Sequence, residues 1–342
     1  MSSGTSGAAA GSPAAASHGS TGAVGWGILG AARIAETALA PAIAIARGAH
    51  LVALGTANPD KARAIAAQHP GMRLHDSYQA VLDDPAVEAV YIPLPNHLHM
   101  DWTLRALDAG KHVLCEKPIA LDAAEIDRLI AARDTSGRLA AEAFMVVHHP
   151  QWQHVRRLLA EGAIGRLAHV EGAFTYNNPD PANYRNQAGT GGGGLRDVGV
   201  YPCVTTRFAT GAEPDLGSLR ADIRHQGPVD TFARVWAEFP GFTMSFYCGM
   251  RQTRHQEMTF HGSDGLIRLN APFNARRYGD TRVETRRADG TVEVARWNAV
   301  DQYACMVEAF GATIRDGGAF ACPLEFSRGN QAMIDAILGA KP

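Results

Sequence analysis

Between residues 24 and 145, short apolar runs alternate regularly with stretches of helical period. The runs predict strands at 24–30, 50–57, 87–94, 111–115 and 138–145. Between them, apolar residues recur three and four positions apart, which predicts helices over 34–47, 60–68, 100–109 and 122–134. Repeated strand-helix-strand units form a parallel sheet with helices on both faces. We therefore expect an α/β domain over 24–145, with the doubly wound Rossmann arrangement.

After residue 145 the pattern changes to longer strand-like segments. One amphipathic helix is expected over 151–161, and two more are expected near 302–315 and 323–338. The segments between them are joined by short turns rich in Gly, Asp and Pro, as in antiparallel sheets. The prediction for 146–342 is thus an α+β domain with a large, mainly antiparallel open sheet. The expected strands are 166–176, 232–239, 243–250, 256–262, 265–270, 282–287 and 291–297.

The ends and the overall charge exclude several classes of partner. Residues 1–23 are small and polar and lack the basic start and apolar core of a signal peptide, so we expect a disordered tail. A formal net charge of −2 disfavours nucleic acid and anionic membrane as partners. No apolar stretch has the length of a membrane span. The five cysteines show no paired spacing, which is typical of free thiols in a reducing compartment, so we expect a cytoplasmic protein.

The first predicted strand runs into a glycine-rich turn. Its glycines follow the spacing G-x-G-x-x-G and stand directly before a helical period. Glycines at such a turn let backbone amides approach a pyrophosphate at the helix N-terminus. The alternative is a tight strand-to-helix turn that binds nothing. The residues assigned here to a dinucleotide are Gly25, Gly27, Gly30, Ala32, Arg33 and Ile34.

The end of the second strand bears on which dinucleotide binds. An NAD site usually places a carboxylate there to bind the 2′-hydroxyl of the ribose. Thr56 and Ala57 offer none, whereas Arg33 or Lys61 supplies positive charge for a 2′-phosphate. The sequence therefore favours NADP, and a pocket that accepts NAD as well is the alternative.

Three further motifs carry a family resemblance. They are PLPNHLH (93–99), GKHVLCEKP (110–118) and GTGGGGLRDVGVYP (189–202). Together with the glycine turn, they resemble the Gfo/Idh/MocA family of oxidoreductases over nearly the whole chain after the tail. The resemblance implies an NAD(P)-dependent dehydrogenase or reductase acting on a sugar, a cyclitol or a related cyclic alcohol. It also implies a homodimer or homotetramer, paired through the large sheets.

The resemblance assigns catalytic roles to Lys117, Asp197 and Tyr201, and a cis peptide bond between Lys117 and Pro118. Moving a hydride between an alcohol carbon and a nicotinamide requires a group that exchanges a proton and a cation that polarises the carbonyl. Residues four apart share a helix face, so Asp197 and Tyr201 are expected to point together into the cleft. We expect Tyr201 to exchange the proton, with its pKa lowered by Lys117; the roles could be reversed. A half-buried core tyrosine is the alternative.

Other residues are weaker candidates. The resemblance places Pro93, Asn96, His99 and Glu116 near the nicotinamide; a strand-end cap is the alternative for His99. No metal site is expected, because His148, His149 and His154 have no carboxylate or cysteine at a regular ligand spacing. Residues 184–186 could reach a substrate, but a solvated loop is the default.

One departure from the family bears on the substrate. Many sugar-oxidising members read F-M-Y-R-H-H-P where this chain has Val146 and Val147 in place of tyrosine and arginine. A more apolar pocket is expected from this change, which would favour a deoxy sugar, an anhydro sugar or a cyclic diol. The alternative function is a non-catalytic NAD(P)-binding regulator on the same scaffold; a metal hydrolase using the histidines has little support.

Overall fold

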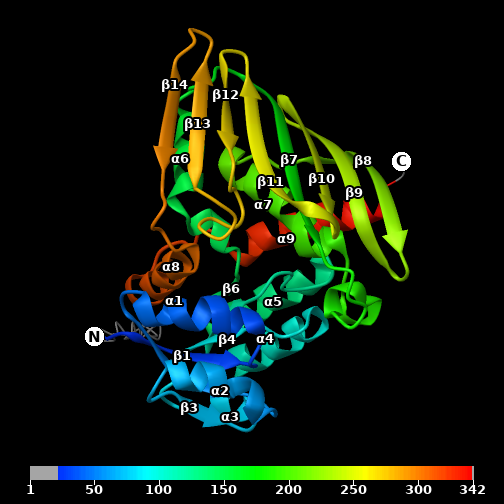
Figure 1. Ribbon diagram of the computed structural model, residues 1–342. Coiled ribbons are helices and arrows are strands. Elements are labelled where there is room, and N and C mark those ends of the chain that lie inside the picture. The colour runs from blue at the N-terminus through cyan, green and yellow to red at the C-terminus, as the bar shows by residue number, and fades with distance from the viewer. Residues whose placement is uncertain (1–21, 341–342) are drawn as a thin grey trace, which may run out of the picture.

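The computed structural model describes residues 22–340, which form two sheets and the helices around them (Figure 1). The first sheet has six parallel strands in the order β3-β2-β1-β4-β5-β6. This is the predicted doubly wound sheet, and its order reverses between β1 and β4, where ligands bind in such folds. The predicted tail lies almost entirely outside the described residues. The strands are β1 Val24–Leu29, β2 Ala49–Gly55, β3 Arg73–His75, β4 Ala89–Ile92, β5 His112–Cys115 and β6 Ala140–Glu142.

The helices predicted between these strands are present. The start of α5 is set by a capping box, in which Asp122 accepts a hydrogen bond from the Glu125 N–H at 2.9 Å. The elements β3, α3 and η2 were missed, because three to five residues are too short to show a period. The helical elements are η1 Ala35–Leu39, α1 Ala40–Ile45, α2 Pro59–Gln68, α3 Tyr78–Leu82, η2 Asn96–Leu98, α4 His99–Asp108 and α5 Ala123–Ser136.

The second sheet has eight strands in the order β14-β13-β12-β11-β7-β10-β9-β8. All its pairs are antiparallel except β7 with β10, which confirms a mainly antiparallel sheet. The edge strand β8 was missed because its sequence is largely polar and exposed. The strands are β7 Leu167–Asn177, β8 Asp215–Gln226, β9 Val229–Phe239, β10 Phe242–Gly249, β11 Arg251–Gly262, β12 Gly265–Leu269, β13 Arg282–Arg287 and β14 Val292–Arg296.

The remaining helical elements belong to the second half of the chain. Helices α8 and α9 lie between the sheets in Figure 1; α8 packs on α1, and α9 packs on α5 and β6. Trp26 of β1 meets Phe310 of α8 with ring centroids 5.3 Å apart, so apolar contacts cross from one half to the other. No helix within residues 22–340 meets the length and apolarity of a bilayer span. The elements are η3 Met145–His148, α6 Pro150–Ala160, η4 Tyr184–Asn186, η5 Ala188–Thr190, η6 Leu195–Gly199, α7 Val200–Thr210, α8 Gln302–Asp316 and α9 Leu324–Gly339.

We propose the domain boundary near residue 145. Strand β6 ends in the first sheet at Glu142, and the next element, η3, already packs against α6 and α8. The second half, 146–342, then builds the wall that faces the strand ends of the first.

Candidate active site

A cavity of about 860 Å³ lies where the carboxyl ends of the parallel strands face the second domain. Segments 30–34, 56–58, 93–96 and 116–117, which follow β1, β2, β4 and β5, line one side. The opposite side comes from β7, β11, η4, η6 and α7 and from the segment after β12. A ligand bound here contacts both domains, as expected for the crevice of an open α/β sheet.

Lys117 and Asp197 meet in this cavity from different domains. The Lys117 Nζ donates to the Asp197 carboxylate Oδ1 at 3.1 Å and to the Asp197 backbone oxygen at 2.7 Å. Both side chains are only about a tenth exposed, at 11% and 12%. The two motifs that carry these residues therefore fold against one another.

Two residues that were not among the predicted site residues complete the carboxylate's surroundings. The Arg185 Nε lies 2.9 Å from Asp197 Oδ1, and the Tyr176 hydroxyl donates to Asp197 Oδ2 at 2.5 Å. Burial disfavours the charged carboxylate, but Arg185 and Lys117 outweigh it and hold the pKa of Asp197 well below its usual range. Burial, together with the Asp197 charge, raises the pKa of Tyr176. Asp197 is therefore an anion that fixes the positions of two cations.

The glycine run before η6 aims Asp197 at the cavity. Gly193 has a φ of 123°, and a Cβ there would lie 2.1 Å from Asp230 Oδ1. Asp230 also accepts a hydrogen bond from the Leu195 N–H at 2.7 Å, which anchors the first residue of η6. A side chain at Gly193 would force this turn apart, so the glycine is required by its conformation and by the close approach of Asp230.

The segment that carries Lys117 is positioned from the other side by two carboxylates of the first domain, Glu116 and Glu142. The Lys117–Pro118 peptide bond is cis, as the resemblance implied. Glu116 accepts a hydrogen bond from the Tyr91 hydroxyl, and burial raises the pKa of Glu116. Glu142, which the sequence reading did not single out, accepts the Ile119 N–H at 3.0 Å, and burial raises its pKa to about 7. The segment around the lysine is thus held at several points.

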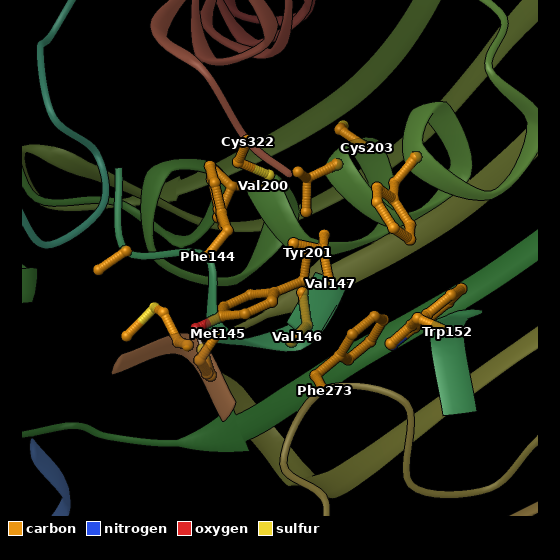
Figure 2. Close-up of a cluster of buried hydrophobic side chains, with 14 of the residues drawn as sticks. Phe144, Met145, Val146, Val147, Trp152, Val200, Tyr201, Cys203, Phe273 and Cys322 are labelled. Carbon is orange, nitrogen blue, oxygen red and sulfur yellow. Dashed lines mark hydrogen bonds between the residues drawn. The ribbon is translucent and has the colours of Figure 1, made fainter. Parts of the chain in front are cut away.

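The prediction for Tyr201 needs correction. It lines the cavity, but its hydroxyl contacts the Met145 Sδ at 3.8 Å, and its ring lies among apolar side chains (Figure 2). The Lys117 Nζ lies 5.2 Å from the centre of the ring. Burial raises the pKa of Tyr201 well above its usual range, so the expected lowering by Lys117 is wrong. Tyr201 supports the lysine as an aromatic surface.

The glycine turn is divided between two roles. Gly25 and Gly27 lie inside β1 and do not line the cavity, which corrects their assignment to a cofactor. A Cβ at Gly25 would lie 2.2 Å from the Ala86 oxygen, and one at Gly27 would lie 2.6 Å from a Val81 methyl carbon, so both serve close packing. Gly30, with a φ of 114°, lies at the strand end and lines the cavity. The other predicted cofactor residues that line it are Ala32, Arg33, Ile34, Thr56, Pro93, Asn96, His99, Glu116 and Lys117.

His99 and Asn96 connect the segments around the cavity. The ring nitrogens of the fully buried His99 lie 2.7 Å from the Pro118 oxygen and 2.7 Å from the Leu94 oxygen. Burial lowers the pKa of His99 to about 4, so the neutral ring donates to one of these carbonyls. Asn96 donates to the Gly191 oxygen at 2.9 Å and thereby links the two domains.

The expectation of a solvated loop at 184–186 is wrong. Arg185 pairs with Asp197, stacks over Tyr184 at 4.5 Å, and lines the cavity with it. Asn186 is 9% exposed and donates to the Asn178 and Asp180 oxygens, which closes the loop. The sequence feature that could have identified these residues as part of the site is the Tyr-Arg pair that stands just before the glycine run.

The valines and histidines after β6 lie outside the cavity. Val146 and Val147 are fully buried and do not line it, so the argument for a more apolar pocket is wrong. His148 packs on Phe320, His149 caps α6, and His154 contacts Trp297. Within residues 22–340, no three His, Cys, Asp or Glu side chains gather in a metal-binding group.

Comparisons with known proteins agree with this geometry. The model of the "Oxidoreductase family, NAD-binding Rossmann fold" matches residues 24–144, and the model of the "GFO/IDH/MocA C-terminal domain" matches 152–268. An uncharacterized oxidoreductase from Rhizobium meliloti is 39% identical over 92% of this chain and 96% of its own. D-xylose 1-dehydrogenase (NADP(+)) 2 from Haloferax volcanii is 31% identical over 91% of this chain and 95% of its own. A crystal structure of a 3-ketoreductase from Actinomadura kijaniata with NADP and TDP-benzene has a TM-score of 0.83 at 30% identity, covering 93% of this chain and 98% of its own.

Proposed function

The chain belongs to the Gfo/Idh/MocA family of NAD(P)-dependent oxidoreductases, and we propose that it transfers a hydride between NADP and a sugar, cyclitol or related cyclic alcohol-ketone pair. The observation that carries this proposal is the contact of Lys117 with Asp197 inside the interdomain cavity. It places a proton-bearing cation beside the space where the strand ends would present a nicotinamide. The names of two relatives, a D-xylose 1-dehydrogenase and a 3-ketoreductase, support the substrate class.

The residues at the strand ends fit a dinucleotide. Gly30, Ala31 and Ala32, the first three residues after β1, carry only small side chains, so backbone amides here could approach a pyrophosphate. When bound, the nicotinamide supplies or accepts the hydride. Pro93, Asn96 and Glu116, which line the cavity, would hold the nicotinamide ring.

We assign the proton exchange to Lys117. In reduction, its ammonium donates a hydrogen bond to the substrate carbonyl oxygen, polarises the carbonyl, and gives up the proton as the alcohol forms. In oxidation, the neutral amine takes the hydroxyl proton. Asp197, itself bound by Arg185 and Tyr176, holds the Nζ in place for both directions. The apolar surroundings of the Tyr201 hydroxyl support the assignment of proton exchange to Lys117 and not to Tyr201.

NADP is the proposed cofactor because cations, and no carboxylate, line the cavity where β2 ends. Thr56 follows the strand directly, and the exposed Arg33 and Lys61 line the cavity beside it. Across residues 22–340, neither cation has an acidic oxygen within 4.0 Å. Both therefore remain available to a 2′-phosphate.

We expect Lys61→Met and Arg33→Met each to lower kcat/KM for NADPH by about 10-fold, since a hydrogen bond to a charged group contributes about 1.5–3 kcal/mol. Steady-state kinetics with both cofactors measures this, and values for NADH should change little. Arg63→Met is the matched control, because Arg63 lies on the same helix, pairs with Asp60, and does not line the cavity. Equal losses for NADPH and NADH would contradict the proposed 2′-phosphate site.

We also propose a homodimer or homotetramer that covers the outer face of the large sheet. Trp236 of β9 and Tyr247 of β10 expose about a third of their surfaces there, at 36% and 37%. Sedimentation velocity should show an oligomer for the unaltered chain and smaller species for Trp236→Lys with Tyr247→Lys. A monomer before any substitution would contradict this assembly.

A further inference from the structure

The wall of the cavity built by β11 and the segment after β12 carries hydrogen-bond donors and no carboxylate. We propose that Arg254, Gln256 and Asn274 form a subsite for an anionic oxygen group on the substrate, with Arg277 adding positive charge beside it. The inference rests on the proposed function and specifies its substrate: a sugar or cyclic polyol that bears a carboxylate, a phosphate or a nucleoside diphosphate.

Arg254 is fixed in place and still has free donors. Its guanidinium lies 5.2 Å over the Tyr278 ring, and its Nη2 donates to the Arg277 oxygen at 2.9 Å. Throughout the described part of the chain, Arg254 has no acidic oxygen within 4.0 Å. Its other N–H groups therefore remain for a ligand, and a planar guanidinium suits the paired oxygens of carboxylates and phosphates.

Gln256 gives an independent indication of a missing acceptor. The residue is 2% exposed and lines the cavity, yet its amide Nε2 has no hydrogen-bond partner within residues 22–340. Its Oε1 accepts the Asn274 N–H at 3.1 Å, so the amide orientation is fixed. A buried amide left without a partner costs about 1–3 kcal/mol, and a substrate oxygen that reaches this Nε2 on binding would recover that cost.

Arg277 strengthens the positive character of this wall from the side of the first domain. It donates to the Thr37 oxygen at 2.5 Å and lies 5.3 Å over the Tyr303 ring. The acidic residues that line the cavity are Glu116 and Asp197, and Asp197 already pairs with Lys117 and Arg185. The donors of the β11 wall thus face no competing carboxylate.

The subsite and Lys117 line the same cavity and are connected by a row of side-chain contacts. Gln256 stands opposite Phe174 in the ladder between β11 and β7. The centroids of the Phe174 and Tyr201 rings are 5.3 Å apart, and the Lys117 Nζ lies over the Tyr201 ring. A substrate that extends along the Phe174 and Tyr201 rings would place its carbonyl at Lys117 and its anionic group at Arg254.

Binding of matched probes to the NADP-saturated protein tests the subsite. The probes are glucose, glucuronate, glucose 6-phosphate and dTDP, measured by calorimetry for the unaltered chain, Arg254→Met and Arg254→Lys. We expect at least one anionic probe to bind about 10-fold or more tightly than glucose, Arg254→Met to remove that advantage, and Arg254→Lys to retain part of it. The probe that binds most tightly shows whether the substrate bears a carboxylate, a phosphate or a nucleoside diphosphate. Arg63→Met is the matched control, because this exposed arginine pairs with Asp60 and does not line the cavity, and it should leave probe binding unchanged.

Three results would overturn the subsite: anionic probes that bind no better than glucose, probe binding unchanged in Arg254→Met, or an equal loss of NADP affinity in that variant. The last result would assign Arg254 to the cofactor. NADP affinity and hydride transfer that depends on Lys117, measured on the same samples, report separately on the proposed function. Loss of both NADP binding and hydride transfer would refute the proposed function. If both are observed but Arg254→Met leaves probe binding unchanged, the subsite alone is refuted.

Discussion

Lys117→Met should lower kcat by about 10³-fold or more while leaving NADP affinity nearly unchanged. The substitution keeps an apolar stem of similar length but removes both the proton and the positive charge that would act on the carbonyl oxygen. General acid-base catalysis contributes about 10²–10⁴-fold, and electrostatic stabilisation of the developing charge adds to it. Single-turnover oxidation of bound NADPH, with a saturating substrate, isolates this step from product release.

Lys61→Met serves as the control for the loss of a cavity lysine. It should weaken the binding of NADPH and leave the single-turnover rate at saturation close to that of the unaltered chain. Lys117→Arg separates charge from proton transfer: it should recover part of the polarisation but little of the rate, because guanidinium stays protonated. A Lys117→Met enzyme that turns over at an undiminished rate would refute the assigned role.

The second large effect concerns Asp197, whose replacement by alanine should destabilise the fold by about 3–5 kcal/mol. Loss of this carboxylate leaves Lys117 and Arg185 side by side without an anion, and breaking a buried pair on one side carries a cost of this order. Asp197→Asn keeps the shape and one acceptor, so its loss should be smaller. Chemical denaturation measures the free energy of unfolding. Asp60→Asn, which breaks an exposed pair, should change it by less than about 1 kcal/mol.

The pH dependence of stability provides a second readout for Asp197. Its pKa is lower in the folded state than in the unfolded chain, so the folded state favours the ionised form. The stabilisation is fully present above the unfolded pKa, near 4, and is lost as the pH falls from there toward the lowered folded value. The unaltered chain should therefore lose more stability than Asp197→Asn below about pH 4. Equal acid profiles for the two proteins would contradict a salt-bridged Asp197.

The sequence predicted the elements whose patterns are long and the residues whose neighbours are local. The alternation over 24–145 was sufficient for the parallel sheet, and the strand-end position of Lys117 was sufficient to place it in the crevice. Elements without a hydrophobic period were missed: β3 is only three residues long, and β8 is a polar edge strand.

The site was predicted less completely, because its contacts are made across the chain. Arg185 meets Asp197 only after the glycine run folds back, and Glu142 meets Ile119 only across neighbouring strand ends. Tyr201 shares the cavity with Asp197, but the environment of its hydroxyl depends on Met145 and the surrounding aromatic rings. Spacing within a helix gives the direction of a side chain, and only the tertiary packing decides its partners and therefore its pKa.

Deuterium transfer tests most directly whether this cavity performs hydride chemistry through Lys117. The protein is incubated with NADPH deuterated at C4 of the nicotinamide and with a panel of keto sugars, keto acids, sugar phosphates and nucleotide keto sugars, and the products are analysed by mass spectrometry. We predict deuterium on the carbinol carbon of at least one product, at a rate that falls about 10³-fold in Lys117→Met. A protein that binds NADPH but yields no deuterated product above the Lys117→Met background would contradict the proposed enzyme and favour a regulator that only binds the dinucleotide.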